Sequence, residues 1–458
     1  MSSLQDRLGL LIAKSRREDK KSPWGAPVPQ EADRHALTVQ VVDLIFEEAI
    51  TEKASDIHIE PDPDGYLRVR YRVDGKLYIA LIITDQSIAV MARIKIMAGL
   101  DTDAISKLKS QDSRCTVHIG NEDYDFRLST FPTVNGEKMA LRLIGKSSDT
   151  ISLENTGLTN RDLILLTQMI QRKQGLLLVC GPTGSGKTTT LYSLLTKINS
   201  PSINVVSIED PVEYRLPGVN QCDIKTKFDF SFADGLRAIL RQDPNIILVG
   251  EIRDKETADI ALRASMTGHL VLSSIHTNSA IGTIMRLINM GLDPYMVSYA
   301  LNGTLAQRLV RAICDKCRVP YTLTSAQLNK LNVTYGITPD MLMAARPQAP
   351  SSVDREGVVY LTSTKDKEKD TSSQVVLYQG KGCEFCRGTG FHGRVGIFEL
   401  VSLNEELREA IVHNVSSTQM VEIAARNGTK PLFKDALEKV KKGITTLDEV
   451  GSILLERS

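Results

Sequence analysis

A glycine-rich run near the middle of the chain contains the residue types that hold a nucleoside triphosphate. It follows the apolar stretch 176–180, precedes the helix-compatible run 189–195, and satisfies every position of the phosphate-loop pattern. Glycines let successive backbone N–H groups point at phosphate oxygens, and the following helix adds the positive end of its dipole. A plain glycine turn is the alternative, but the flanking strand and helix favour a nucleotide. The predicted contacts are Gly181, Pro182, Thr183, Gly184, Ser185, Gly186, Lys187, Thr188 and Thr189. Within this pattern, Lys187 reaches the β- and γ-phosphates and the Thr188 hydroxyl binds Mg²⁺.

Two acidic clusters follow apolar runs that predict strands. Glu251 ends the run that begins at Ile246 and is the candidate acid on the metal side, although Gly-Glu replaces the usual Asp. Phosphoryl transfer needs one acid to organise Mg²⁺ and another to orient the attacking water. Glu209 follows a second apolar run and is our choice for positioning and deprotonating that water, with Glu213 in reserve. An exposed loop carboxylate is the alternative for either acid taken alone.

Two histidines flank the apolar run 270–275. A strand histidine is more often a packed residue than a catalyst, but one at the carboxyl end of a strand faces the ligand crevice of a parallel sheet. His276 fits that position better than His269. We therefore predict a functional role for His276 and leave His269 open.

Four of the seven cysteines form two Cys-x-x-Cys pairs, Cys314/Cys317 and Cys383/Cys386. Paired cysteines in a reducing compartment favour metal over disulfide, and four thiolates complete a tetrahedral zinc site. Nothing suggests an open coordination position, so we expect a structural metal. Two pairs of free thiols are the alternative.

The elements that must position these residues fall into distinct regions. Alternating strands, together with helices over 38–52 and 89–99, predict a small α+β domain that ends near residue 145. Buried strand runs that alternate with helices predict a parallel sheet covered on both faces. The expected domains are a polar segment 1–36, the α+β domain 37–146, a nucleotide-binding core 147–312, a cysteine subdomain 313–400 with an inserted hairpin, and a helical region 401–458.

Composition excludes several classes of protein. A chain of 458 residues is too long for one core. The net charge is +1 with 24% charged residues, which gives no sign of polyanion binding, so we expect no direct contact with nucleic acid. No apolar run approaches the roughly 18 residues needed to span a bilayer, and the N-terminus lacks the layout of a signal peptide. We expect any membrane role to be peripheral.

The order of these motifs resembles the secretion superfamily of hexameric motors, the assembly ATPases of type II secretion and type IV pili. The resemblance labels 209–213 the aspartate box, 250–251 the Walker B element and 269–276 the histidine box. The matching stretches are Ser55–Pro61, Arg127–Thr133 with Gly136-Glu137, Gly181–Thr188, Ile208–Glu213, Gly235–Pro244, Gly250–Asp254 and Thr267–Thr277.

The resemblance also implies a fold, cofactors and partners. It implies a RecA-like ATPase domain after a smaller PAS-like domain, a tetracysteine zinc subdomain and a helical C-terminus. ATP, Mg²⁺ and Zn²⁺ are the implied cofactors. Arg127 and Arg142 match arginines that reach phosphates from the smaller domain, which requires domain closure; Arg237 and Arg241 match those that act on a neighbouring subunit. A surface salt bridge is the alternative for each arginine.

We therefore expect a cytoplasmic homohexamer at the inner-membrane face that drives pilus or pseudopilus assembly. Its partners would be inner-membrane platform and docking proteins. A retraction or DNA-uptake motor is the nearest alternative, and the cysteine pairs argue against retraction. A RecA-like DNA translocase and a nucleotide-gated scaffold without turnover are the other classes. The motifs do not separate type II secretion from type IV pili.

Two features depart from the family pattern. Full-length assembly motors usually place a further domain before the region matching 56–61, whereas here a mostly polar segment, 1–36, precedes the first helix. Its stretch 4–13 has weak amphipathic character, as a short docking helix would need. The gap between the cysteine pairs, positions 318–382, is also longer than usual, and we expect a charged hairpin around 365–369 to fill it.

Overall fold

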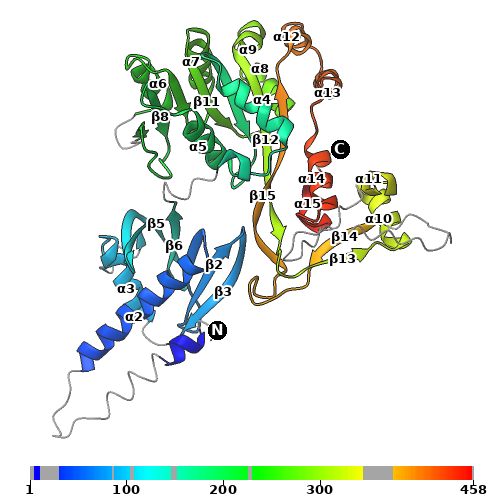
Figure 1. Ribbon diagram of the computed structural model, residues 1–458. Coiled ribbons are helices and arrows are strands. Elements are labelled where there is room, and N and C mark those ends of the chain that lie inside the picture. Colours follow the sequence, from blue (N-terminus) through cyan, green and yellow to red (C-terminus); the bar gives the residue numbers. More distant parts are fainter. Residues whose placement is uncertain are drawn as a thin grey trace, which may run out of the picture. The chain divides into compact units, whose positions relative to one another are not determined.

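The computed structural model describes residues 5–10, 30–84, 87–103, 108–145, 152–224, 230–343 and 375–455. The chain divides into two compact units, an N-terminal unit Met1–Asp149 and a C-terminal unit Thr150–Ser458 (Figure 1). Among the described residues, every helix is too short or too polar to cross a bilayer.

The N-terminal unit is a six-stranded antiparallel sheet with strand order β3-β2-β1-β6-β5-β4. Its helices pack on the apolar face, where the rings of Phe46 and Phe126 lie 4.9 Å apart. This arrangement confirms the α+β prediction. The elements are α2 (Gln30–Thr51), β1 (Asp56–Pro61), β2 (Leu67–Val73), β3 (Lys76–Ile83), α3 (Ser87–Met97), β4 (Gln111–Ile119), β5 (Glu122–Thr133) and β6 (Gly136–Ile144).

Strand alternation decides which side chains face the core of this unit. Ile57 and Ile59 of β1 are buried against the helices, while Asp56, His58 and Glu60 lie on the other face of the sheet. A short helix over residues 5–10 also belongs to this unit, because Leu8 is buried in the same apolar cluster. The predicted amphipathic stretch 4–13 is therefore helical over its described part.

The C-terminal unit is built on a seven-stranded sheet with strand order β15-β12-β7-β11-β10-β8-β9. All neighbours pair in parallel except β12 and β15, which are antiparallel. The strands are β7 (Gly175–Cys180), β8 (Val205–Glu209), β9 (Val219–Asp223), β10 (Ile246–Val249), β11 (Leu270–Ile275), β12 (Leu301–Ile313) and β15 (Phe391–Ser402). The central strands β7, β8, β10 and β11 are buried along their whole length, as helix-covered parallel sheets require, whereas the edge strand β9 alternates between half-buried and exposed residues.

Helices cover both faces of this sheet. One apolar cluster joins Leu177 and Val179 of β7 to α4 and α5, and another joins Leu178 and Cys180 to α6, α7, α8 and α9. The predicted doubly covered parallel sheet is confirmed. These elements are the 3₁₀ helix η3 (Leu153–Asn155), α4 (Asn160–Ile170), α5 (Lys187–Ile198), α6 (Phe232–Ile239), α7 (Lys255–Met266), α8 (Ala280–Asn289) and α9 (Pro294–Ala300).

The pair β12–β15 extends beyond the sheet toward a two-stranded sheet of β13 (Arg318–Thr322) and β14 (Val376–Gly380), as Figure 1 shows. The helices α10 (Ser325–Tyr335) and α11 (Pro339–Met343) follow β13. The last four helices confirm the helical C-terminus: α12 (Glu405–Val412), α13 (Ser417–Arg426), α14 (Leu432–Lys441) and α15 (Leu447–Leu455). The predicted charged hairpin around 365–369 lies outside the described residues.

Candidate active site and metal centre

The glycine-rich run joins the end of β7 to the start of α5, as the phosphate-loop pattern requires. Gly186 is the N-cap of α5 and has a φ of +88°, a left-handed conformation that suits glycine. A Cβ on Gly181 would lie 2.5 Å from the carbonyl oxygen of Gln307, so a larger residue would push the loop away from β12. The loop therefore curls against a neighbouring strand with its amides at a helix N-terminus.

Lys187 lies at the first position of α5. Its Nζ donates hydrogen bonds to the carbonyl oxygens of Gly181 at 2.9 Å and Pro182 at 3.1 Å. Burial lowers the pKa of Lys187, and the charge of Glu251 opposes that shift. The ammonium group therefore lies inside the loop and close to the Walker B acid.

Strand order brings the predicted acid and histidine to the same sheet edge. Ile275 pairs with Cys180, so His276 follows its strand at the level where the phosphate loop begins. Glu251 comes two residues after the neighbouring strand β10. His276 Nε2 lies 3.2 Å from Oε2 of Glu251, which forms a direct contact between two predicted site residues.

Arg253 contacts the other oxygen of Glu251. Its guanidinium lies 2.5 Å from Oε1 of Glu251 and 3.5 Å from Oδ2 of Asp210. Burial alone would raise the pKa of Glu251, but hydrogen bonding and charge from Arg253, with help from His276, hold that pKa below its ordinary value. Glu251 is therefore ionised at neutral pH and held from both sides.

Glu209 has a different environment, although it ends the adjacent strand β8. Its side chain is 3% exposed and accepts hydrogen bonds from Ser207 at 2.6 Å, from Gln221 at 3.2 Å, and from the Tyr192 hydroxyl. Burial raises its pKa. Near-complete burial and three hydrogen-bond donors leave this carboxylate little room to contact an attacking water.

Two further residues of the aspartate and histidine boxes, Glu213 and His269, are not in contact with Glu251 or Lys187 in the described part of the chain. The amide of Glu213 donates to the Tyr192 hydroxyl at 3.3 Å, which ties the backbone of the aspartate box to Glu209. His269 precedes β11 at the opposite sheet edge, where its ring contacts the carbonyl of Ala264 at 3.0 Å. The strand between the histidines is six residues long, or about 20 Å, so His269 lies outside the candidate site.

The two predicted arginines of the N-terminal unit belong to one cross-strand row. Arg127 pairs with Arg142 and also with Arg114 of β4, while Arg142 pairs with Asp56. Directly opposite residues share a face of the sheet. Asp56 also pairs with Arg72, and its carboxylate lies 3.1 Å from Arg142 and 3.3 Å from Arg72. The row therefore presents four arginines and one aspartate.

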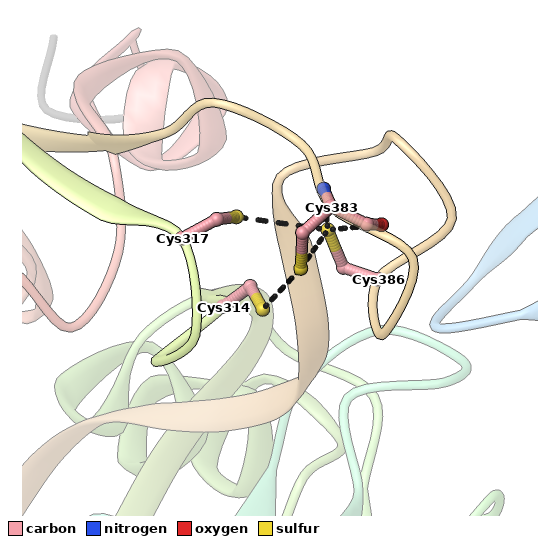
Figure 2. A group of neighbouring side chains, drawn as sticks. All are labelled: Cys314, Cys317, Cys383 and Cys386. Atoms are coloured by element: carbon pink, nitrogen blue, oxygen red, sulfur yellow. Dashed lines mark hydrogen bonds between the residues drawn. The ribbon is translucent and has the colours of Figure 1, made fainter.

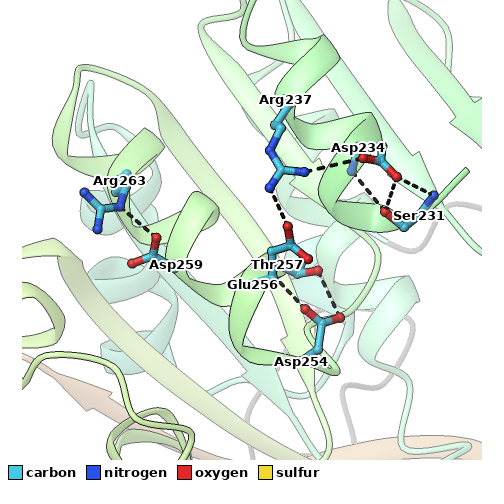
Figure 3. Close-up of polar contacts among 8 residues, drawn as sticks. All are labelled: Ser231, Asp234, Arg237, Asp254, Glu256, Thr257, Asp259 and Arg263. Carbon is cyan, nitrogen blue, oxygen red and sulfur yellow. Dashed lines mark hydrogen bonds and ion pairs between the residues drawn. The ribbon is translucent and has the colours of Figure 1, made fainter.

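Arg237 lies on α6 and Arg241 follows the end of that helix, and Figure 3 shows Arg237 directed toward Glu256 of α7. Arg237 also lies 3.4 Å from Asp234. Gln242, next to Arg241, accepts a hydrogen bond through its carbonyl from Asn204, which immediately precedes β8. Arg241 therefore lies near the amino ends of the strands, at the edge opposite the phosphate loop of the same chain. Neither arginine contacts that loop.

The four paired cysteines converge at the far ends of β12 and β15 (Figure 2). Their sulfur atoms all lie within 4.8 Å of one another, with the closest pairs at 3.7 Å. A Zn–S bond of about 2.3 Å in a tetrahedron implies sulfur atoms about 3.8 Å apart, so the cluster fits zinc. Burial disfavours the Cys386 thiolate, but amide N–H groups of Cys383 and Gly390 lower its pKa to about 6.

The structure adds residues that sequence reasoning missed. Tyr192 donates to Glu209, Arg253 contacts Glu251, and Gln307 and Arg308 lie beside the phosphate loop. Arg253 lies inside the matched stretch 250–254 and could have been noted there. Tyr192, Gln307 and Arg308 carry no local signal, because packing between elements distant in the sequence brings them to the site.

Comparisons with known proteins agree with this geometry. Residues 31–452 match the family model described as type II/IV secretion system protein. The chain is 41% identical to type II secretion system protein E of Pseudomonas aeruginosa, over 93% of this chain and 77% of the relative. It is also 41% identical to the type IV pilus assembly ATPase PilB of Thermus thermophilus, over 95% of this chain and 45% of the relative.

Solved structures show the same fold. The ADP-bound pilus retraction motor PilT is 25% identical, with a TM-score of 0.58 and coverage of 91% of this chain and 96% of that one. The ATPase DotB of Legionella pneumophila is 20% identical, with a TM-score of 0.62 and coverage of 90% and 95%. The chain therefore belongs to the type II/IV secretion system protein family, and its predicted place among the secretion and pilus ATPases is confirmed.

Proposed function

We propose that this protein hydrolyses ATP to drive assembly of a pilus or pseudopilus. The observation that supports this most directly is the shared sheet edge, where the phosphate loop, Glu251 and His276 lie together. In this proposal Lys187 neutralises phosphate charge, and the loop amides fix the triphosphate before reaction.

Glu251 is the acid best placed to act on the attacking water. It is ionised, partly exposed and oriented by His276 and Arg253, whereas Glu209 is almost fully buried. We therefore assign water orientation and deprotonation to Glu251, and give Glu209 the role of holding the aspartate box through Tyr192. Thr188 would hold Mg²⁺, which neutralises charge on the β- and γ-phosphates.

The cysteine cluster supports an assembly motor over a retraction motor. We propose that Cys314, Cys317, Cys383 and Cys386 hold a structural zinc ion that fixes the ends of β12 and β15. The assembly relatives are about 41% identical, against 25% for the retraction motor, which favours the same conclusion. A homohexamer that works with membrane platform and docking proteins at the cytoplasmic face of the inner membrane completes the proposal.

Phosphate release tests this function directly. The full chain should release phosphate from Mg·ATP, and Lys187→Ala should reduce the rate to background because the triphosphate loses its main positive contact. Lys173→Ala, an exposed lysine at the opposite sheet edge, is the matched control and should keep the rate. Equal rates for Lys187→Ala and the unaltered chain would overturn the proposal.

A further inference from the structure

Two consecutive residues of β12 hold the two loops between which the reaction would take place. β12 runs parallel to β7, and Ala306 pairs with Cys180, the last residue before the phosphate loop. Gln307 and Arg308 therefore follow at the level of the loop itself. They are 1% and 7% exposed, so they act inside the protein.

Strand alternation sends these two side chains to opposite faces of the sheet. Leu305 packs with the cluster around α5, and Gln307 shares its face. Ala306 packs with the cluster around α8, and Arg308 shares that one. One strand can thus contact the phosphate loop on one side and the segment leading into α8 on the other.

Gln307 holds the phosphate loop through a side-chain hydrogen bond to the loop backbone. Its Nε2 donates to the carbonyl oxygen of Ser185 at 2.7 Å, in the middle of the loop. A Cβ on Gly186 would lie 3.2 Å from the same nitrogen, and one on Gly181 would lie 2.5 Å from the Gln307 carbonyl. Both glycines are therefore packed against this residue.

Arg308 fixes the segment that carries His276. Its guanidinium donates to the carbonyl of Asn278 at 3.1 Å, to the Asn278 side chain at 3.3 Å, and to the carbonyl of Gln307 at 3.1 Å. Asn278 lies two residues after His276 and just before the N-cap of α8. The start of α8 is itself fixed, because Ala280 contacts Thr304 at 3.0 Å and Glu399 at 2.8 Å.

We propose that Gln307 and Arg308 are positioning residues of the ATPase site. Gln307 sets the phosphate loop for nucleotide binding, and Arg308 sets His276 against Glu251 for the chemical step. This inference rests on the proposed function for its kinetic part. Its structural part does not depend on ATP turnover, because it states only that two neighbouring residues each hold a different loop in place.

The kinetic test compares kcat and KM for Mg·ATP in the full chain. Arg308→Lys keeps the charge but loses the fork whose two nitrogens reach Gln307 and Asn278 together, so kcat should fall about 10- to 100-fold with KM nearly unchanged. Gln307→Leu should raise KM about tenfold and change kcat little. Arg311→Lys, on the same strand but paired with Glu449, is the matched control and should leave both constants unchanged.

A double-mutant cycle separates positioning from general damage. If Arg308 acts through His276, then Arg308→Lys should change kcat less than about twofold in a His276→Ala background. The same fold-loss in both backgrounds would overturn the inference. Asn278→Ala removes only an exposed acceptor and should lower kcat in the same direction, which guards against misfolding of the arginine variant.

Hydrogen exchange distinguishes this inference from the proposed function. Arg308→Lys should speed exchange several-fold over 276–283 and spare 181–190, and Gln307→Leu should do the reverse. If the unaltered chain releases no phosphate, the proposed function fails. The hydrogen-exchange rates of the two variants still test whether Gln307 and Arg308 position the two loops. Unchanged exchange, or equal changes at both segments in both variants, would overturn these positioning roles.

Discussion

At the scale of single residues, the central feature is a carboxylate held between an arginine and a histidine. Glu251 contacts His276 through one oxygen and Arg253 through the other. Arg253 is 57% exposed and also reaches Asp210, so it connects the Walker B element to the aspartate box. The ionisation of Glu251 therefore depends on a residue at the protein surface.

This dependence predicts a shift in the pH profile of hydrolysis. Arg253 opposes the effect of burial and lowers the pKa of Glu251, so Arg253→Gln should raise that pKa. A base works only when ionised, so the acid limb of kcat against pH should move to higher pH. The variant should lose more activity at pH 6 than at pH 8, measured as phosphate release relative to the unaltered chain.

The control for this experiment is Arg263→Gln, which removes an exposed arginine of α7 that pairs with Asp259 instead (Figure 3). Its acid limb should coincide with that of the unaltered chain. An unchanged or downward-shifted limb in Arg253→Gln would show that another group controls the ionisation.

The sequence predicts site residues that belong to a short contiguous motif, but it does not predict site residues that only tertiary contacts bring together. Lys187 and the four cysteines follow from spacing, because phosphate loops and zinc knuckles are short contiguous motifs. The placement of His276 follows from its position after a strand. The engagement of Glu209 could not be foreseen, since its donor Tyr192 lies on a helix seventeen positions earlier.

At the scale of elements, two glycines allow the strands of the cysteine subdomain to cross. A Cβ on Gly380 would lie 2.0 Å from the carbonyl oxygen of Gly390, and one on Gly390 would lie 2.5 Å from that of Gly380. The Gly390 carbonyl also accepts the amide of Cys314 at 3.0 Å. The crossing thus brings the two cysteine pairs together.

Gly380→Ala should therefore impair zinc binding while leaving all four ligands in place. The added methyl group meets backbone, which cannot move aside as a side chain could, so the strands must separate. Zinc measured by atomic absorption should fall from about one ion per chain to well below it. The melting temperature should fall as well.

Lys381→Ala is the control for that glycine, since it changes an exposed neighbour without adding an atom at the crossing. It should keep stoichiometric zinc. Full zinc content in Gly380→Ala, at the same affinity, would show that the crossing does not assemble the site.

The sequence predicts strands with a regular apolar pattern better than strands whose polar residues are buried by distant parts of the chain. Alternation finds β1 and β2, and continuous apolar runs find β8, β10 and β11. The sequence does not reveal β12, because its 13 residues include Asn302, Gln307 and two arginines, whose polar groups are satisfied by residues distant in the chain. The pairing of β14 with β13 joins segments more than fifty residues apart, and no local pattern indicates it.

At the scale of the whole molecule, each of the two units carries groups that can bind phosphate. The C-terminal unit has a phosphate loop, and the N-terminal unit has a row of four arginines around Asp56. Arg127 is exposed, while Arg142 is held by that aspartate. An arginine that meets the triphosphate only when the units close would link hydrolysis to their movement.

This link predicts a specific kinetic defect in Arg127→Ala. Loss of a guanidinium that stabilises the transferring phosphoryl group should lower kcat by on the order of 10²- to 10³-fold, with little change in the affinity for ADP. Arg68→Ala removes an arginine from the same sheet face that pairs with Glu60 instead, and it should keep most of the activity. Because both variants lose one positive charge from one sheet, a difference between them reports position rather than net charge. Equal kcat values would place the triphosphate out of reach of the arginine row and leave the phosphate loop to act without the N-terminal unit.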